Sequence, residues 1–393
     1  MRHFSYAMVA LGGLSLMVPF WTTARADSVY QQTNLTSDVP GMANNLDPNL
    51  KNAWGISFAN ASPFWVSDQR TGVSTLYNGA GVPQSLVVTI PPAAGTGDGS
   101  PTGTVNNGTT DFKLTPAANS AAVFLFDTLN GNISGWNPNV NPTNAVNEVT
   151  TPGAVYTGLA LANNGVQNQL YAVDNAAGAG HSTINVFGPT FAAASSSGFV
   201  DPNLPSGFTP YNIQLINGKL FVTYEGPGAT GLINVFDTNG NFLQRFSSDS
   251  HLAQPWGMTL APTTFGQFGG DLLVGNKANG EINAFDPTTG AFLGTLLNAN
   301  GQPIADPGLW GLAFRSATSG FDPNTLFFTA GVGSEGGNIY THGIFGSITL
   351  VPEPSSAILL GMGMILLCGV CHWGARRRLV GSAPVLASGA DPR

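Results

Sequence analysis

Asn52-Ala-Trp-Gly-Ile-Ser-Phe58 is the first of six related segments that decide the fold of this chain. Each copy places a glycine or asparagine just before a short apolar stretch. The other copies are Ser100-Pro-Thr-Gly-Thr-Val105, Val155-Tyr-Thr-Gly-Leu-Ala-Leu161, Thr209-Pro-Tyr-Asn-Ile-Gln214, Gln254-Pro-Trp-Gly-Met-Thr-Leu260 and Gly308-Leu-Trp-Gly-Leu-Ala-Phe314. Aligned on Gly55, Gly103, Gly158, Asn212, Gly257 and Gly311, they are 48, 55, 54, 45 and 54 residues apart. This period is close to the ~40 to 50 residues of a four-stranded propeller blade.

Each segment is followed by a second apolar strand, a glycine-containing turn and a third strand, and helical periodicity is absent from the sequence. The chain segment Val29–Leu35 has strand character but no partner in the first repeat. We therefore predict an all-β, six-bladed β-propeller over residues 28–350. We expect the N-terminal strand to close the ring, because closure leaves only short, protected sheet edges.

The order of strand, aspartate, turn and strand resembles the NHL and gluconolactonase-like six-bladed propellers. The phrases Asp47-Pro-Asn-Leu-Lys-Asn-Ala-Trp-Gly55 and Gly270-Asp-Leu-Leu-Val-Gly-Asn276 resemble a family of exported bacterial propellers. That resemblance runs along most of the mature chain. It implies the fold and export, and no established activity.

Composition limits the class of partner. Only 9% of residues are charged and the formal net charge is −8, whereas glycine and proline are abundant at 51 and 27 residues. Binding to phosphate backbones requires clustered lysine and arginine, which this chain lacks before its last 20 residues. We therefore expect a turn-rich globular protein with no nucleic-acid partner.

The N-terminus has the pattern of a secretory signal peptide over residues 1–26. Arg2 precedes an apolar run from Ala7 to Phe20, and Ala24-Arg-Ala26 supplies small residues for cleavage. The apolar run is shorter than the ~20 residues that span a bilayer, so cleavage is favoured over a retained anchor.

The C-terminus has a second export signature over residues 351–378. An apolar stretch from Ser355 to Trp373 is long enough for a hydrophobic transmembrane helix, and the positive-inside rule places the arginines that follow it, and residues 379–393, in the cytoplasm. The arrangement resembles the PEP-CTERM sorting signal, with Pro352, Glu353 and Pro354 as the motif and Arg376, Arg377 and Arg378 as the basic cluster.

This resemblance implies an exosortase-type processing enzyme as partner and a Gram-negative host that produces exopolysaccharide. The chain would cross the inner membrane, be anchored transiently by its C-terminal helix, and then reach the cell surface or the extracellular matrix. Both cysteines lie in this tail, so the exported domain has no disulfide.

Polar residues end most of the second strands and define a candidate metal site. Aligned by repeat, these positions are Asp68, Asp127, Asp174, Tyr224, Asn276 and Ala330. Blade geometry places them around one mouth of the channel, and their oxygen ligands suit Ca²⁺ or another hard divalent cation. The metal candidates are Asp68, Asp127, Asp174 and Asn276. The alternative is that these side chains accept hydrogen bonds from their own turns.

Three tryptophans recur at one repeat position and define a candidate ligand site. Trp54, Trp256 and Trp310 each precede the aligned glycine, and an aromatic collar there could stack on sugar rings. The alternative is that each side chain wedges between neighbouring blades.

Two functions follow from these candidates. The first is a non-enzymatic exported propeller that binds a ligand, glycan or protein, with extracellular polysaccharide as a possible partner. The second is a divalent-metal-dependent hydrolase or lactonase with its site at the channel mouth. No residue is assigned a catalytic role, because neither a nucleophile elbow nor a general base accompanies the aspartates.

Overall fold

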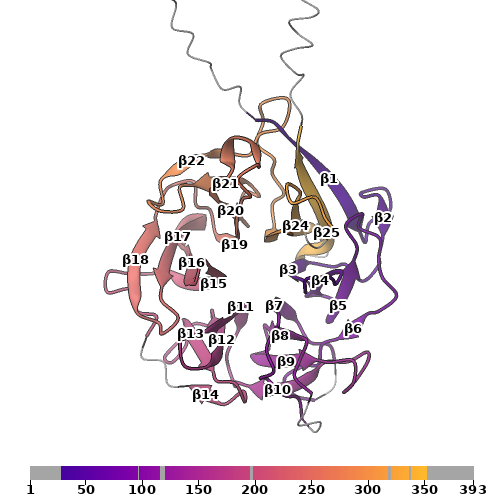
Figure 1. Cartoon of the computed structure of the whole chain (residues 1–393), viewed down its shortest axis with the longest axis vertical. Coiled ribbons are helices and arrows are strands. Elements are labelled where there is room, and N and C mark those ends of the chain that lie inside the picture. Colours follow the sequence, from indigo (N-terminus) through magenta and orange to yellow (C-terminus); the bar gives the residue numbers. More distant parts are fainter. Residues whose placement is uncertain are drawn as a thin grey trace, which may run out of the picture.

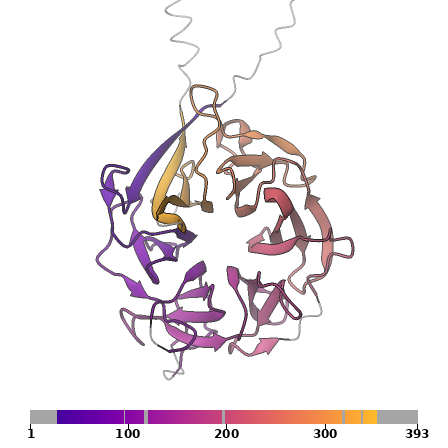
Figure 2. The same ribbon diagram turned by 180° about the vertical axis from the view of Figure 1, so that it is seen from behind.

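Short apolar strands separated by turns build six antiparallel sheets that stand around a central axis (Figure 1). The computed structural model describes residues 28–95, 97–115, 120–194, 198–316, 320–335 and 338–351. Each sheet is one blade, and the view from behind shows the same ring (Figure 2). The all-β six-bladed propeller predicted from the repeats is therefore confirmed.

The first five blades follow the repeat, with the innermost strand first. Blade 1 is β3 (Ala53–Ser57), β4 (Phe64–Asp68), β5 (Val73–Tyr77) and β6 (Val88–Thr89), and blade 2 is β7 (Pro101–Asn106), β8 (Phe124–Thr128), β9 (Asn132–Trp136) and β10 (Val146–Thr150). Blade 3 is β11 (Tyr156–Asn163), β12 (Asn168–Asp174), β13 (Thr183–Phe187) and β14 (Ala193–Ala194). Blade 4 is β15 (Thr209–Ile216), β16 (Lys219–Gly226), β17 (Thr230–Phe236) and β18 (Phe242–Ser247). Blade 5 is β19 (Pro255–Leu260), β20 (Leu272–Asn276), β21 (Ile282–Phe285) and β22 (Phe292–Thr295).

The sixth blade combines the two ends of the described chain. It contains β23 (Leu309–Phe314), β24 (Leu326–Glu335) and β25 (Asn338–Leu350), and β1 (Tyr30–Ser37) pairs antiparallel with β25. The short β2 (Asn45–Leu46) runs parallel to β1 at the outer edge. Two 3₁₀ turns, Pro227–Ala229 and Gly266–Phe268, are the helical segments of the described residues.

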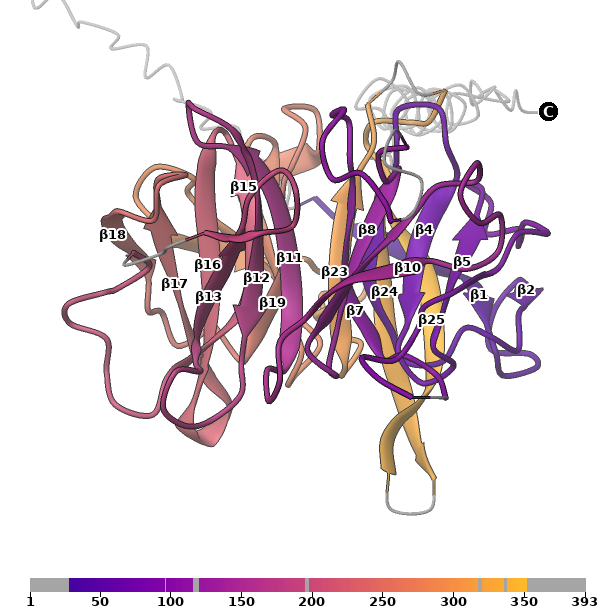
Figure 3. The ribbon, with the colours of Figure 1, turned by 90° about the horizontal axis from the view of Figure 1, so that it is seen from below.

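The second strand of blade 6 is longer than the repeat alignment predicts. The second strand of blade 6 was expected to end at Ala330, but β24 continues to Glu335 and β25 begins at Asn338. The β24–β25 hairpin consequently extends beyond the other strands on one side of the ring (Figure 3). We call this side the hairpin face; each innermost strand begins there, since Leu309 pairs with Ala330.

The aligned glycines of the repeat allow neighbouring innermost strands to touch. A Cβ on Gly55 would lie 2.4 Å from the carbonyl oxygen of Thr102, and one on Gly257 would lie 2.2 Å from that of Trp310. Blade 4 has Asn212 instead, whose Nδ2 donates a hydrogen bond of 2.7 Å to the carbonyl oxygen of Trp256. The ladder between the first and second strands is irregular beside this position in all six blades. The repeated small residue is therefore a requirement of ring packing.

The core lies between and within the blades rather than at one centre. Separate clusters of buried apolar side chains join blades 5 and 6, blades 3 and 4, and blades 4 and 5. Tyr30 of β1 belongs to the first of these and lies 5.0 Å from the ring of Phe265. β1, a strand of blade 6, is thus also packed against blade 5.

The predicted signal peptide and sorting tail lie outside the described residues, and so do Pro352, Glu353, Pro354, Arg376, Arg377 and Arg378. Across the part of the chain that the structure does describe, no helix combines the length and the apolar character needed to span a membrane.

Candidate functional site

A pocket of about 420 Å³ occupies the central channel and is lined by the innermost strands of all six blades. It runs from the aligned glycines toward the ends of these strands, opposite the hairpin face. Leu215, near the end of β15, is 40% exposed and marks its mouth. The size falls within the ~300 to 1,000 Å³ of typical small-molecule sites.

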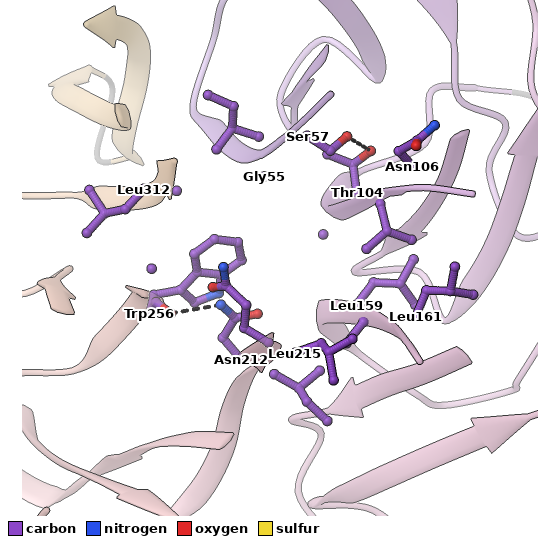
Figure 4. Close-up of a pocket in the computed structure, with 18 of the residues that line it drawn as sticks. Gly55, Ser57, Thr104, Asn106, Leu159, Leu161, Asn212, Leu215, Trp256 and Leu312 are labelled. Carbon is purple, nitrogen blue, oxygen red and sulfur yellow. Dashed lines mark hydrogen bonds between the residues drawn. The ribbon is translucent and has the colours of Figure 1, made fainter. Parts of the chain in front are cut away.

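The pocket wall carries hydroxyl, amide and apolar side chains, and none of its described lining residues is charged. Figure 4 shows how these side chains converge on the channel. The polar members are Ser57, Thr104, Asn106, Asn212 and Gln214, and the apolar members include Leu159, Leu161, Leu312 and Trp256.

Four of these polar side chains are held in place and one is free. Asn106 donates from Nδ2 to the carbonyl oxygen of Val123 at 2.9 Å. The hydroxyls of Ser57 and Thr104 lie 3.0 Å apart across blades 1 and 2, and Asn212 is bonded to the backbone of Trp256. Within the described residues, the Gln214 side chain makes no hydrogen bond although it lines the pocket. The site therefore offers preorganised neutral donors and acceptors beside apolar surface.

An aromatic plug closes the hairpin end of this channel. We define it as Trp54, Tyr211, Trp256 and Trp310, which form one buried cluster. Trp54 and Trp310 stack with their centroids 3.7 Å apart, and Trp256 meets both edge-on at 6.0 and 5.8 Å.

The three predicted tryptophans are thus brought together on the axis, each no more than 6% exposed. They contact one another instead of forming an open collar or separate wedges between blades. Trp256 alone among them lines the pocket. Its indole nitrogen donates to the carbonyl oxygen of Thr157 on the far side of the channel, at 2.9 Å.

Asp68 and Asp174 lie at equivalent positions, at the ends of their second strands. Each side chain makes hydrogen bonds within its own blade. Asp68 is fully buried and accepts a hydrogen bond of 2.7 Å from Thr75. Burial raises its pKa well above the ordinary value, with smaller contributions from neighbouring carboxylates. Asp174 accepts the backbone N–H of Val155 at 3.0 Å and lies 2.6 Å from Nδ1 of His181.

Asn276 has a corresponding local role. Its Oδ1 accepts the backbone N–H of Ala253 at 3.1 Å, and its Nδ2 donates to the carbonyl oxygen of His251 at 2.7 Å. Asn276, like Asp174, fixes the loop that enters its own innermost strand.

Asp127 is not equivalent to the other three, contrary to the sequence alignment. Pro101 pairs with Thr128, whereas the corresponding Ala53 and Tyr156 pair with Asp68 and Asp174. Blade 2 is therefore shifted by one residue, and Asp127 faces the other side of its strand. Its Oδ1 accepts the N–H of Gly103 at 2.6 Å.

No three histidine, cysteine, aspartate or glutamate side chains of the described residues gather in a group that could hold a metal ion. The four predicted metal candidates instead make the separate contacts given above. A divalent-cation site at these residues stays a prediction of the sequence.

We expect Asp127→Thr to be tolerated and to change the pH dependence of stability. Thr329 holds the equivalent place in blade 6, where its hydroxyl accepts the N–H of Gly311 at 2.9 Å. Burial raises the pKa of Asp127 from 3.8 to about 6, so the native state retains this proton longer than the unfolded state. Its contribution to stability is complete below pH 3.8 and is lost as the pH rises through about 6.

Urea unfolding of wild type and Asp127→Thr between pH 3.5 and 8 measures this difference. Relative to wild type, the free energy of unfolding of the variant should increase as the pH rises over this window. A constant difference would contradict the assignment.

Comparisons with known proteins support the fold and give no activity. The chain is 32% identical over 344 residues to the uncharacterized protein R648 of Acanthamoeba polyphaga mimivirus, covering 82% of each chain. It is also 32% identical to uncharacterized protein L690 of the same virus, covering 74% of this chain and 80% of that one. No protein-family model matches the chain.

Among solved structures, the apo form of soluble aldose sugar dehydrogenase from Escherichia coli matches with a TM-score of 0.51 and 11% identity, over 82% of this chain and 99% of that one. A protein of unknown function from Bacteroides thetaiotaomicron matches with a TM-score of 0.50 and 10% identity, over 83% and 77%. At these identities the likeness concerns the fold alone.

Proposed function

The chain belongs to the family that includes the mimivirus proteins R648 and L690, and we propose that this member is a binding protein that takes an uncharged saccharide into its central channel. The observation that carries the proposal is the lining of the pocket, which combines neutral hydrogen-bonding groups with apolar surface and an indole. A neutral sugar presents the matching chemistry, since its hydroxyls need donors and acceptors while its C–H faces pack on apolar and aromatic groups.

The same lining favours binding over catalysis. General acid–base chemistry needs a titratable side chain within hydrogen-bond reach of the reacting group. The described pocket residues include no acid, lysine or histidine. The hydrolase or lactonase alternative would have to operate elsewhere on the molecule, and no observation of the site favours it.

Screening the protein against an array of neutral oligosaccharides tests the proposal. We expect one class of glycan to bind, and Gln214→Trp to reduce that affinity at least tenfold because the indole would fill a pocket of this size. Val166→Trp is the matched control, since Val166 is 88% exposed and does not line the pocket.

Either of two results would contradict the proposal. One is an array on which no neutral glycan binds. The other is a bound glycan whose affinity Gln214→Trp leaves equal to that of Val166→Trp, which would place the ligand outside the channel.

We further propose that the protein is exported and sorted as its termini indicate. Support comes from the signal-peptide pattern in residues 1–26 and from the resemblance of Pro352, Glu353 and Pro354 with the following arginines to a PEP-CTERM signal. An exosortase would then be its processing partner. Deleting residues 352–378 should release the protein from the membrane fraction; retention of the truncated protein there would contradict this sorting.

We also propose that β1 acts as the closure of the ring. Its seven paired positions along β25 and the burial of Tyr30 support this role. A propeller whose ends are joined in one sheet cannot open without breaking that ladder.

A further inference from the structure

The outer side of the aromatic plug faces away from the channel. Unlike the uncharged pocket lining, it carries an ammonium group. Lys277 directly follows β20 at the hairpin face, and its side chain is half-buried. Its ammonium nitrogen lies 5.5 Å from the ring centroid of Tyr211 and 5.9 Å from that of Trp310. A cation is thus held against the plug by two aromatic rings.

This cation has no carboxylate partner among the described residues. Its hydrogen-bond partner there is Oε1 of Gln254, at 3.2 Å. The other end of the Gln254 amide donates to Glu225 at 3.4 Å, so an amide separates the two charges. Burial lowers the pKa of Lys277, and the nearby Glu225 carboxylate opposes that change.

Two phenols on this side also have O–H groups available as donors. The hydroxyls of Tyr211 and Tyr340 make no hydrogen bond within the described chain, and burial raises the pKa of both, so both stay protonated at neutral pH. The Tyr340 ring meets the Trp310 ring edge-on, with centroids 6.1 Å apart, and Arg70 donates to the carbonyl oxygen of Tyr340 at 2.7 Å. The Glu225 oxygens already accept amide N–H groups from Asn175 and Gln254.

The patch thus presents one ammonium without a carboxylate partner and two phenols whose O–H groups are available as donors. We propose that the outer side of the plug binds a carboxylate, with Lys277 as its ionic partner and Tyr211 and Tyr340 as hydrogen-bond donors. Charge-assisted bonds of this kind are stronger than neutral ones. This site is independent of the channel proposed above, which carries no charge and is separated from it by the plug.

Titration of the ¹⁵N-labelled protein with sodium glucuronate at constant ionic strength tests the site. The indole N–H signal of Trp310, which donates to Asn52 at 3.0 Å, reports on the plug. We expect it to shift saturably with glucuronate, to respond to acetate as a competitor, and to be unaffected by glucose at the same concentrations.

Three variants make the result specific. Lys277→Met should weaken glucuronate binding about tenfold or more, through loss of the charge-assisted bonds, whereas Lys219→Met, at an exposed lysine of blade 4, should leave it unchanged. Glu225→Gln should strengthen binding severalfold, because it removes a nearby negative charge. Weaker glucuronate binding by Glu225→Gln would contradict the electrostatic basis of the proposed site.

The two proposed sites fail separately. Gln214→Trp should weaken binding of the neutral glycan at least tenfold and preserve the response to glucuronate. An unshifted Trp310 signal in wild type, or equal affinities for wild type and Lys277→Met, would overturn the carboxylate site whatever the array shows.

Discussion

Gly257→Ala should lower the free energy of unfolding by about 3 kcal/mol, the upper part of the usual range for overpacking. The new Cβ would lie 2.2 Å from the carbonyl oxygen of Trp310 and 3.0 Å from the backbone nitrogen of Leu312. These are backbone atoms of the neighbouring blade, so relief requires the two blades to move apart. Chemical denaturation followed by circular dichroism measures the loss.

Gly108→Ala is the matched control, because Gly108 is exposed and no heavy atom lies within 4 Å of its Cβ position. It should change stability by less than about 0.5 kcal/mol, as surface substitutions usually do. Equal effects of the two substitutions would show that contact between innermost strands does not limit the fold.

Tyr30→Ala should have an effect of similar size, about 4 kcal/mol, the range for removing a large buried aromatic side chain. Tyr30 is 1% exposed and packs against Phe265 and Phe268, with centroid distances of 5.0 and 6.2 Å. Its loss removes the apolar contact of β1 with Phe265 and Phe268. Thermal unfolding of the variant measures the contribution of closure.

Gln31→Ala provides the comparison, since Gln31 is the next residue in the same strand and is exposed. Its backbone pairing with Thr349 is retained. If Tyr30→Ala were as stable as Gln31→Ala, β1 would be a dispensable edge strand and the proposed closure would be wrong.

The blade number could be predicted because each blade repeats the same local requirements. Gly55, Gly257 and their equivalents recur where neighbouring backbones touch, so the spacing of these residues directly records the blades. The length of the β24–β25 hairpin could not be predicted in the same way. Blade 4 has only a shorter extension, of two paired positions beyond Tyr224, and the longer hairpin is bonded to Arg70 of blade 1 through the carbonyl oxygens of Ile339 and Tyr340.

The site was less predictable, for two physical reasons. Alignment by residue type placed Asp127 with Asp68, but a shift of one residue in a strand sends the side chain to the opposite face. The pocket itself depends on which side chains face the axis. Ser57, Thr104 and Gln214 follow the aligned small residues by one or two positions, and only that spacing from the repeat could have indicated them.

The tryptophans illustrate the same limit. Their shared repeat position correctly predicted that Trp54, Trp256 and Trp310 belong together. Whether they surround an opening or fill it depends on their neighbours, because blades 2 and 3 place the smaller Thr102 and Thr157 at this position. Because these two threonines are small, the indoles have room to cross the axis. The indole nitrogen of Trp256 donates to the carbonyl oxygen of Thr157.

A crystal structure of the protein with the neutral oligosaccharide selected on the array tests the central claim most directly. The account predicts ligand density inside the channel, between Gln214 and Trp256, with sugar hydroxyls bonded to the neutral side chains of the wall. Density on the outer side of the plug or along the outer strands, with an empty channel, would contradict it.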